Sequence, residues 1–208
     1  GDGIHFFSDL IAKTTARKLD AEAQFDDVAM LQYTGGTTGV AKGAMLTHAN
    51  ITSNVRQIAA WFPNTVQGKE VLLAALPFFH IFGFTTCMMW AHKIAAALVL
   101  APNPRDISAL IKGINKHKVT LFPAVPAIFN AINQHPGIEK VDMSSIKSCF
   151  SGSAPLPIAV LQRFEELTGC RIVEGFGMTE SSPVTHGNPM QGVRKIGSIG
   201  IPFPGTDM

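Results

Sequence analysis

At 208 residues the chain is long enough to bury a sizeable core, and it falls between one large domain and two small ones. Its 17 basic and 15 acidic residues leave a formal charge of +2, which gives no support to a nucleic-acid partner. No basic-then-apolar signal segment opens the sequence, and its three cysteines lack metal-ligand spacing. These features predict reduced thiols in a cytoplasmic protein.

The first elements follow from hydrophobic spacing. A short helix is expected over residues 4–19, and a buried strand over residues 28–33 leads into a loop rich in Gly and Thr. A returning strand is expected at residues 44–46, after which Thr47 is placed to cap a helix. One face of that helix would carry Ile51, Val55, Ile58, Ala59 and Phe62.

Two kinds of segment alternate along the rest of the chain. Apolar runs of strand length occupy residues 71–76 and 96–100, and further strands are expected at residues 119–122, 146–150 and 171–173. The helices expected between them cover residues 82–90, 105–118, 127–134 and 157–168. Short, unalternating apolar strands separated by helices predict an α/β fold. We therefore expect one compact piece with a mostly parallel sheet flanked by helices on both faces.

The longest apolar stretch covers residues 81–91. It is too short to span a bilayer, which needs roughly 18 to 20 apolar residues, so a buried helix is predicted there. Ligands of open parallel sheets bind beyond the carboxyl ends of the strands. Loops with unusual residues follow residues 33, 150 and 173, and we expect these loops to converge on a site.

Residues 33–43 give the strongest chemical signal, with the sequence YTGGTTGVAKG. Glycines let the backbone fold tightly, so that its N–H groups can point at an anion. Thr34, Thr37 and Thr38 add hydroxyl groups, and Lys42 adds a positive charge. The segment lacks the Gly-Lys-Ser/Thr ending of the usual P-loop. The alternative is a plain hairpin turn, for which two residues suffice; the longer pattern favours a triphosphate.

This loop resembles the phosphate-binding signature of the adenylate-forming superfamily, which includes acyl-CoA synthetases, luciferases and the adenylation domains of peptide synthetases. Three more stretches are similar to its other motifs and follow in the expected order. They are residues 76–83 (LPFFHIFG), 151–156 (SGSAPL) and 174–181 (EGFGMTES). The last resembles the YGxTE motif, with Phe176 at the aromatic position. The chain looks like a central fragment of the large N-terminal domain of such an enzyme.

The resemblance implies a role for each matched residue. The phosphates of ATP would be held by Thr34, Gly35, Gly36, Thr37, Thr38, Gly39 and Lys42. The rest of the nucleotide would contact Gly152, Ser153, Ala154, Pro155, Glu174, Gly175, Phe176, Gly177 and Thr179. The acyl substrate would contact His80, Phe79 and Gly83. Thr179, Glu180 and Lys42 would be catalytic, with Glu180 holding Mg²⁺.

Other readings of single residues remain open. Mg²⁺ often takes one carboxylate plus phosphate oxygens, which suits Glu180, although a glutamate in a loop is in isolation more often only solvated. A lone histidine among apolar residues, such as His80, is more often a core side chain. Cys149 lies in the strand at residues 146–150, next to the loop at residues 151–156, and no base for it is visible, so packing is favoured over covalent catalysis.

The sequences of residues 31–48 and 103–106 are most similar to those of bacterial long-chain fatty acyl-CoA synthetases. Such an enzyme activates a fatty acid with ATP and transfers the acyl group to coenzyme A. One group of apolar residues has two interpretations: it either lines a tunnel for the acyl chain or belongs to the ordinary core. The group consists of Phe78, Phe79, Ile81, Phe82, Phe84, Met88 and Met89. An adenylate-forming enzyme for an aryl or amino acid, and a nucleotide-binding relative without catalysis, are the alternatives. A phosphohydrolase is less favoured, because no water-activating carboxylate pair is evident.

Parts of the superfamily pattern do not occur in these residues. The resemblance implies a ribose-binding aspartate and a small C-terminal domain with a catalytic lysine, and neither is found. The chain begins at Gly1 and stops shortly after the run at residues 201–205, which resembles an entry into further structure. We expect part of a longer enzyme, with little or no ligase activity by itself. Peripheral membrane contact of the parent enzyme stays open.

Overall fold

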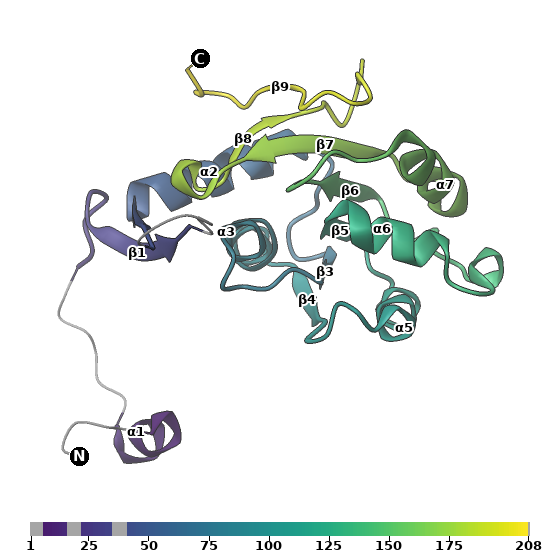
Figure 1. Ribbon diagram of the computed structural model, residues 1–208. Coiled ribbons are helices and arrows are strands. Elements are labelled where there is room, and N and C mark those ends of the chain that lie inside the picture. Colours follow the sequence, from purple (N-terminus) through teal and green to yellow (C-terminus); the bar gives the residue numbers. More distant parts are fainter. Residues whose placement is uncertain (1–5, 16–21, 35–40, 208) are drawn as a thin grey trace.

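The computed structural model describes residues 6–15, 22–34 and 41–207. Within them, a seven-stranded sheet has the order β4-β3-β5-β6-β7-β8-β9, and β1 and β2 form a separate hairpin (Figure 1). The strands are β1 Val28–Tyr33, β2 Gly43–Thr47, β3 Val71–Ala74, β4 Ala97–Leu100, β5 Leu121–Ala124, β6 Ser148–Ser151, β7 Ile172–Gly177, β8 Val184–Gly187 and β9 Ile201–Pro202.

Helices connect and cover these strands. The α-helices are α1 Phe7–Lys13, α2 His48–Trp61, α3 Ile81–Gly83, α4 Trp90–Lys93, α5 Ile107–His117, α6 Pro126–Asn133 and α7 Ile158–Thr168. The π-helical segment is η1 Phe84–Met89, and the 3₁₀ turns are η2 Ile138–Lys140 and η3 Thr179–Ser181. Five strands, from β4 to β7 in the sheet order, run parallel, and β8 and β9 run antiparallel. The predicted α/β fold with a mostly parallel sheet is confirmed.

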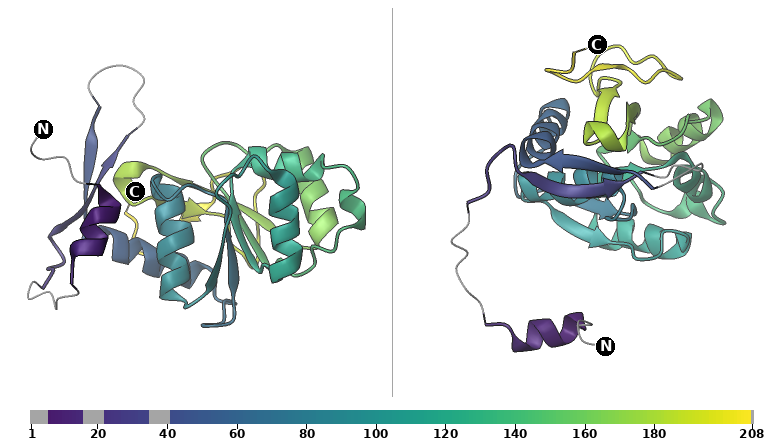
Figure 2. Two further views of the ribbon diagram at one scale, coloured as in Figure 1. Left: turned by 90° about the horizontal axis from the view of Figure 1, so that it is seen from below. Right: turned by 60° about the vertical axis from the view of Figure 1, so that its left-hand side comes forward.

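The two faces of the sheet carry separate hydrophobic cores. Leu73 and Phe122 pack with α5, α6 and α7 on one face. Leu72, Phe150 and Val173 pack with α2, α3 and α4 on the other. The left view of Figure 2 shows the sheet between these two helical layers. Because both faces are buried, the strands read as continuous apolar runs rather than alternating ones.

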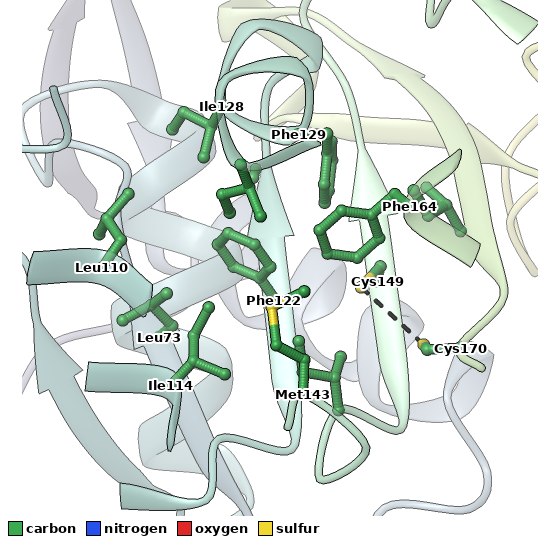
Figure 3. Packing of buried hydrophobic residues seen from close by; sticks show 14 of the residues in the cluster. Leu73, Leu110, Ile114, Phe122, Ile128, Phe129, Met143, Cys149, Phe164 and Cys170 are labelled. Atoms are coloured by element: carbon green, nitrogen blue, oxygen red, sulfur yellow. Dashed lines mark hydrogen bonds between the residues drawn. The ribbon is translucent and has the colours of Figure 1, made fainter. Parts of the chain in front are cut away.

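Aromatic rings fill the core between the sheet and α6 and α7 (Figure 3). The ring centroids of Phe122 and Phe129 are 5.4 Å apart, and those of Phe129 and Phe164 are 4.9 Å apart, both edge to face. The Sγ atoms of Cys149 and Cys170 lie 3.9 Å apart beside them as free thiols. Burial raises the pKa of the Cys149 thiol well above its ordinary value, which supports packing rather than catalysis.

Helix α2 begins as its sequence predicts. The Asn50 N–H donates to Thr47 Oγ1 at 3.1 Å, and the Thr47 N–H donates to Asn50 Oδ1 at 2.9 Å. This reciprocal pair satisfies two backbone donors at the helix end. Of the expected stripe, Ile51, Val55 and Ile58 are buried, Ala59 is half-buried, and Phe62 is buried just after the helix ends.

The strand predicted at residues 28–33 has the expected bounds but lies outside the parallel sheet. Within the described residues, β1 pairs with β2 in antiparallel fashion, Met30 opposite Leu46 and Leu31 opposite Met45. Met30 and Leu46 pack against α2 and η1. Leu31 is 60% exposed and Met45 is 70% exposed on the other face. The prediction of a buried strand is therefore wrong, because a hairpin has only one neighbouring layer to cover it.

The strand predicted at residues 171–173 continues further than its apolar run. The main chain of Glu174 still pairs with Ser151 of β6, and Phe176 pairs with His186 of β8. The expected loop after residue 173 is therefore largely strand, which the antiparallel partner β8 extends to Gly177. Of the three loops expected at the carboxyl ends of parallel strands, the loop after residue 150 lies at such an end. The strand that ends at Tyr33 belongs to the hairpin and not to the parallel sheet.

The apolar run at residues 81–91 forms the predicted buried helix, and its centre is π-helical. None of the described helices is long and apolar enough to cross a bilayer. At the N-terminal side, the helix expected over residues 4–19 is shorter, because α1 ends at Lys13 and Thr14 is extended; residues 4, 5 and 16–19 lie outside the described residues. No residue of α1 is buried, and Figure 1 shows it apart from the sheet.

Candidate active site

A cleft of about 250 Å³ opens where β6 and β7 end. Four stretches far apart in the sequence line it, namely the segment before and within α3, the turn after β6, the end of β7 with η3, and the start of β8. Its lining residues include His80, Phe82, Ser153, Phe176 and Thr179. The cleft therefore brings together three of the four motifs that the sequence analysis singled out.

A second hollow of about 320 Å³ shares Ser153 and Phe176 with the first. The exposed residues Ala154 and Pro155 form one wall, and residues 197–199 form another. Phe176 is 42% exposed, although it is a large aromatic residue. A partly exposed ring shared by two hollows offers a flat apolar face to a planar ligand.

Glu174 connects two loops that line the second hollow. Its side chain is buried, Oε1 accepts the Leu156 N–H at 3.4 Å, and Oε2 accepts the Gly197 N–H at 2.9 Å. These bonds tie the loop after β6 to the loop at residues 197–199. The sequence suggested that Glu174 contacts the nucleotide. In the structure, its carboxylate accepts hydrogen bonds from backbone amides.

Glycines allow the close approaches around the cleft. A Cβ atom on Gly175 would lie 2.3 Å from a ring carbon of Phe150, and one on Gly152 would lie 3.2 Å from the ring of Phe82. The rings of Phe82 and Phe150 meet edge to face, with centroids 5.9 Å apart, and both line the cleft. Gly175 and Gly177 line both hollows. Side chains at these positions would collide with the Phe150 ring or the Pro183 main chain and so push apart the walls of the cleft.

His80 is the N-cap residue of α3 and is exposed, so the interpretation as a core histidine is wrong. Its Nδ1 accepts the Phe82 N–H at 3.1 Å and caps the helix. An accepting Nδ1 carries a lone pair, so the proton of the neutral ring is on Nε2. Because His80 lines the cleft, this N–H is a hydrogen-bond donor available to a ligand there.

The structure does not bring Phe79 and Gly83 into the cleft. Phe79 is 83% exposed and lies with Leu100 and Pro102 along a separate apolar groove. Gly83 is buried, and a Cβ atom there would approach the carbonyl oxygen of Pro77 to 2.3 Å. Gly83 therefore allows close packing of α3.

The apolar residues considered as walls of a tunnel separate into three environments. Ile81 and Phe82 line the cleft, and Phe78 lines the separate groove. Phe84 and Met89 pack beneath the β1–β2 hairpin. Successive residues of a helix point in directions about 100° apart, so neighbours in this run face different partners. They do not form one continuous wall.

The turn η3 carries Thr179 and Glu180 at the edge of the cleft. Thr179 is half-buried and lines the cleft, whereas Glu180 is exposed. Cα atoms of η3 and β2 approach within 8 Å, so the hairpin lies beside this turn. The Gln32 side chain of β1 also donates to the Phe79 carbonyl at 2.9 Å. The hairpin and the cleft motifs therefore share one side of the molecule.

The base of the Gly/Thr loop is closed by the Thr34 N–H, which donates to the Lys42 carbonyl at 2.9 Å. Lys42 itself is exposed beside the start of β2. The remaining members of the phosphate signature lie outside the described residues: Gly35, Gly36, Thr37, Thr38 and Gly39.

A metal ion would find few protein ligands here. In the described ranges, no three His, Cys, Asp or Glu residues come together to hold one. Glu180 supplies one exposed carboxylate next to the Thr179 hydroxyl. Mg²⁺ is commonly bound through one or two carboxylates together with phosphate oxygens and water, so this donor set fits Mg²⁺ that arrives with a nucleotide.

Two buried polar residues support the cleft, and the sequence analysis missed both. Asn54 of α2 bonds the main chain of Val184, and the Thr85 hydroxyl of η1 donates to the Ser182 carbonyl. A signal for them exists in the sequence. Asn54 interrupts the apolar stripe of α2, and Thr85 lies within the longest apolar run. Polar residues at core positions need partners, which only the fold reveals.

Comparison with known proteins decides the family. The model of the AMP-binding enzyme family matches residues 6–208. This chain belongs to the AMP-binding enzyme family. Long-chain-fatty-acid–CoA ligase of Bacillus subtilis (strain 168) is 49% identical over 193 residues, which cover 93% of this chain and 34% of that protein. This AMP-binding enzyme chain therefore spans about a third of the length of the curated relatives it matches.

Solved structures share its fold. The anthranilate CoA ligase AuaEII, in complex with anthranoyl-AMP, has a TM-score of 0.86 at 26% identity and covers 99% of this chain and 39% of its own. ATP-bound MatB from Rhodopseudomonas palustris has a TM-score of 0.82 at 28% identity and covers 95% and 38%. The α/β fold described above is thus the fold of the AMP-binding enzymes.

Proposed function

We propose that these residues form part of the large domain of a longer ligase that activates a long-chain fatty acid with ATP and transfers it to coenzyme A. The observation that carries the proposal is the cleft that gathers His80, Ser153, Phe176 and Thr179 from three distant motifs. The relative from Bacillus subtilis supports the choice of acid through its name and 49% identity.

In this proposal the nucleotide occupies the two hollows on either side of Phe176. Adenine lies against the Phe176 ring and beside residues 152–155, which line the two hollows. The phosphates extend towards the hairpin, where Lys42 and the Gly/Thr loop supply positive charge and N–H donors. Glu180 holds Mg²⁺, which supplies further positive charge to the phosphates.

The chemistry has two halves. In the first, a carboxylate oxygen of the acid attacks the α-phosphorus of ATP, and the bond to pyrophosphate breaks. In the second, the coenzyme A thiol attacks the acyl carbonyl and AMP leaves. The first half places one anion against another, so it needs aligned donors and cations rather than a covalent nucleophile. The His80 Nε2–H would orient the carboxylate, and the Thr179 hydroxyl would bind the α-phosphate or the carboxylate.

An aryl acid is a second candidate substrate, and the two aromatic rings that line the cleft favour it. The rings of Phe82 and Phe150 line this cleft of about 250 Å³. AuaEII, which shares the fold, is an anthranilate CoA ligase. A long acyl chain would gain about 0.8 kcal/mol for each buried methylene, which favours the first candidate.

The test uses a full-length enzyme that contains these 208 residues. ATP–pyrophosphate exchange and thioester formation are measured with a fatty acid of sixteen carbons, a benzoate and an amino acid. We expect the fatty acid to have a kcat/KM at least about tenfold above the others, since buried methylenes add binding energy. A higher value for the benzoate would support the second candidate. ATP binding without exchange for any acid would contradict both.

The matched variants Glu180→Gln and Glu166→Gln locate the chemistry within that enzyme. We expect E180Q to lower the exchange rate by roughly 100-fold, because the charge that holds the cation is lost. Glu166 is an exposed carboxylate of α7, and E166Q should leave the rate unchanged. The 208-residue chain alone should show little turnover, since water exclusion over the adenylate needs a closing domain.

A further inference from the structure

The segment at residues 182–184 joins η3 to β8 and forms part of the cleft wall through Pro183 and Val184. Its main-chain groups are held from both sides. The Thr85 hydroxyl donates to the Ser182 carbonyl at 3.1 Å, and the Pro183 carbonyl accepts the Met178 N–H at 3.1 Å. This second bond closes the turn that contains Thr179 and Glu180.

Asn54 holds the next residue along the chain. Its Oδ1 accepts the Val184 N–H at 3.1 Å, and its Nδ2 donates to the Val184 carbonyl at 2.6 Å. The side-chain amide thus satisfies both main-chain groups of one residue at the start of β8. Asn54 is 3% exposed and Thr85 is fully buried, so neither has water as an alternative partner. Buried polar side chains with such partners specify one arrangement of the segments that they join.

Ser182 is the residue that most needs this support. It ends η3 with a φ of +75°, in the left-handed region that residues other than glycine rarely adopt. Such a conformation costs free energy and persists where its surroundings enforce it. The Thr85 hydroxyl bonds the carbonyl of this residue, and it comes from a different layer of the fold. It therefore acts on the end of the turn that carries Thr179 and Glu180.

We propose that Thr85 is a positioning residue for the reaction. Its hydroxyl fixes the Ser182 carbonyl, so that η3 presents Thr179 to the cleft and holds Glu180 beside it, and Asn54 fixes the strand that follows. The inference rests on the proposed function for the roles of Thr179 and Glu180. The π-helical form of η1 fits this role, since π-helical turns are frequent at functional sites.

Thr86 provides a matched control. It is the next residue of η1, it is 2% exposed, and its hydroxyl donates at 2.6 Å to the carbonyl of Phe82 in α3, which runs directly into η1. Thr85→Val and Thr86→Val therefore remove the same group from equally buried positions. The first change breaks a bond to the cleft segment, and the second breaks a local bond. Thr85→Ser retains the hydroxyl and serves as the conservative rescue.

Hydrogen exchange of the 208-residue chain tests the positioning directly. We expect the amides of Met178, Ser181 and Ser182 to exchange about fivefold faster in T85V, since one hydrogen bond is lost. T86V and T85S should stay within about twofold of the unchanged chain. Equal effects of T85V and T86V, or none from T85V, would overturn the proposal. If T85V does not fold, T85S and Thr85→Ala are compared in the same experiment.

The full-length enzyme supplies a second readout. The Mg²⁺ concentration that gives half-maximal pyrophosphate exchange should rise about fivefold in T85V and stay unchanged in T86V, because Glu180 is displaced only in T85V. A merely structural role would lower the amount of folded enzyme without moving this concentration. If the unchanged enzyme shows no exchange, the proposed function fails, while the exchange of the three amides still decides whether Thr85 holds the turn.

Discussion

The parallel sheet and the β1–β2 hairpin support the candidate site in different ways. The sheet has a buried core on each face, with Phe129 and Phe164 fully enclosed. The hairpin has one covered face, and Met45 on the other is 70% exposed. The sheet therefore fixes the cleft walls through dense packing, whereas the hairpin brings Lys42 to the same side through few contacts. Stability and phosphate binding should accordingly respond to different substitutions.

The largest expected effect separates these two regions by stability. Phe129→Ala removes a fully buried ring that contacts Phe122 and Phe164, and it should lower the free energy of unfolding by about 3–5 kcal/mol. Met45→Ala on the open face of the hairpin should change it by less than about 0.5 kcal/mol. Urea denaturation of both variants measures the difference. Similar losses for the two would mean that the hairpin is as much a part of the core as the sheet.

A glycine pair sharpens the comparison at the cleft itself. Gly175→Ala would place a methyl group 2.3 Å from the Phe150 ring, and we expect a loss of about 1–3 kcal/mol together with weaker nucleotide binding. Gly113→Ala in α5 meets Val99 only at 3.6 Å and should stabilise the chain by up to about 1 kcal/mol. Thermal unfolding checks both signs. A neutral Gly175→Ala would show that the strand ends can shift to admit a side chain.

The smallest expected effect is a pH dependence at Glu70, whose carboxylate is buried just before β3. Burial alone would raise the pKa of Glu70, but hydrogen bonds from Thr120 and the Val66 N–H, together with Lys147, hold it below the usual value of 4.5. A lowered folded-state pKa adds stability above pH 4.5, and that stability is lost as the pH falls through the folded pKa.

Glu70→Gln should therefore flatten the fall in stability below pH 4.5, when unfolding is measured from pH 6 to pH 3. The exposed carboxylate of Glu166 gives the control, and Glu166→Gln should retain the acid dependence of the unchanged chain. An acid dependence that survives in E70Q would place its origin in other carboxylates.

The sequence predicted the sheet better than the hairpin, and the reason is physical. Strands buried on both faces leave a continuous apolar run, which marked β3 clearly. β1 has similar composition, but its burial depends on whether a second layer covers it, and no local pattern records that. The extension of β7 to Gly177 was missed because Gly175 and Gly177 resemble loop residues. Their strand conformation depends on pairing with β8.

The site residues were also predicted only in part from the sequence. Motif spacing identified His80, Phe176 and Thr179, and the fold brings these residues into one cleft. Phe79 and Gly83 belong to the same motif as His80, but they face other neighbours, because side-chain direction depends on how α3 packs. Asn54 and Thr85 escaped notice because their partners lie 130 and 97 residues away in the sequence.

The most direct test of the central claim is a titration of the 208-residue chain with AMP, followed residue by residue through amide chemical shifts. We expect the largest shifts at residues 152–155 and 175–180, which surround the two hollows at the ends of β6 and β7. A further hollow of about 410 Å³, lined by Lys147 and Arg171, lies where β6 and β7 begin. Shifts centred on that hollow, with none around Phe176, would contradict the account.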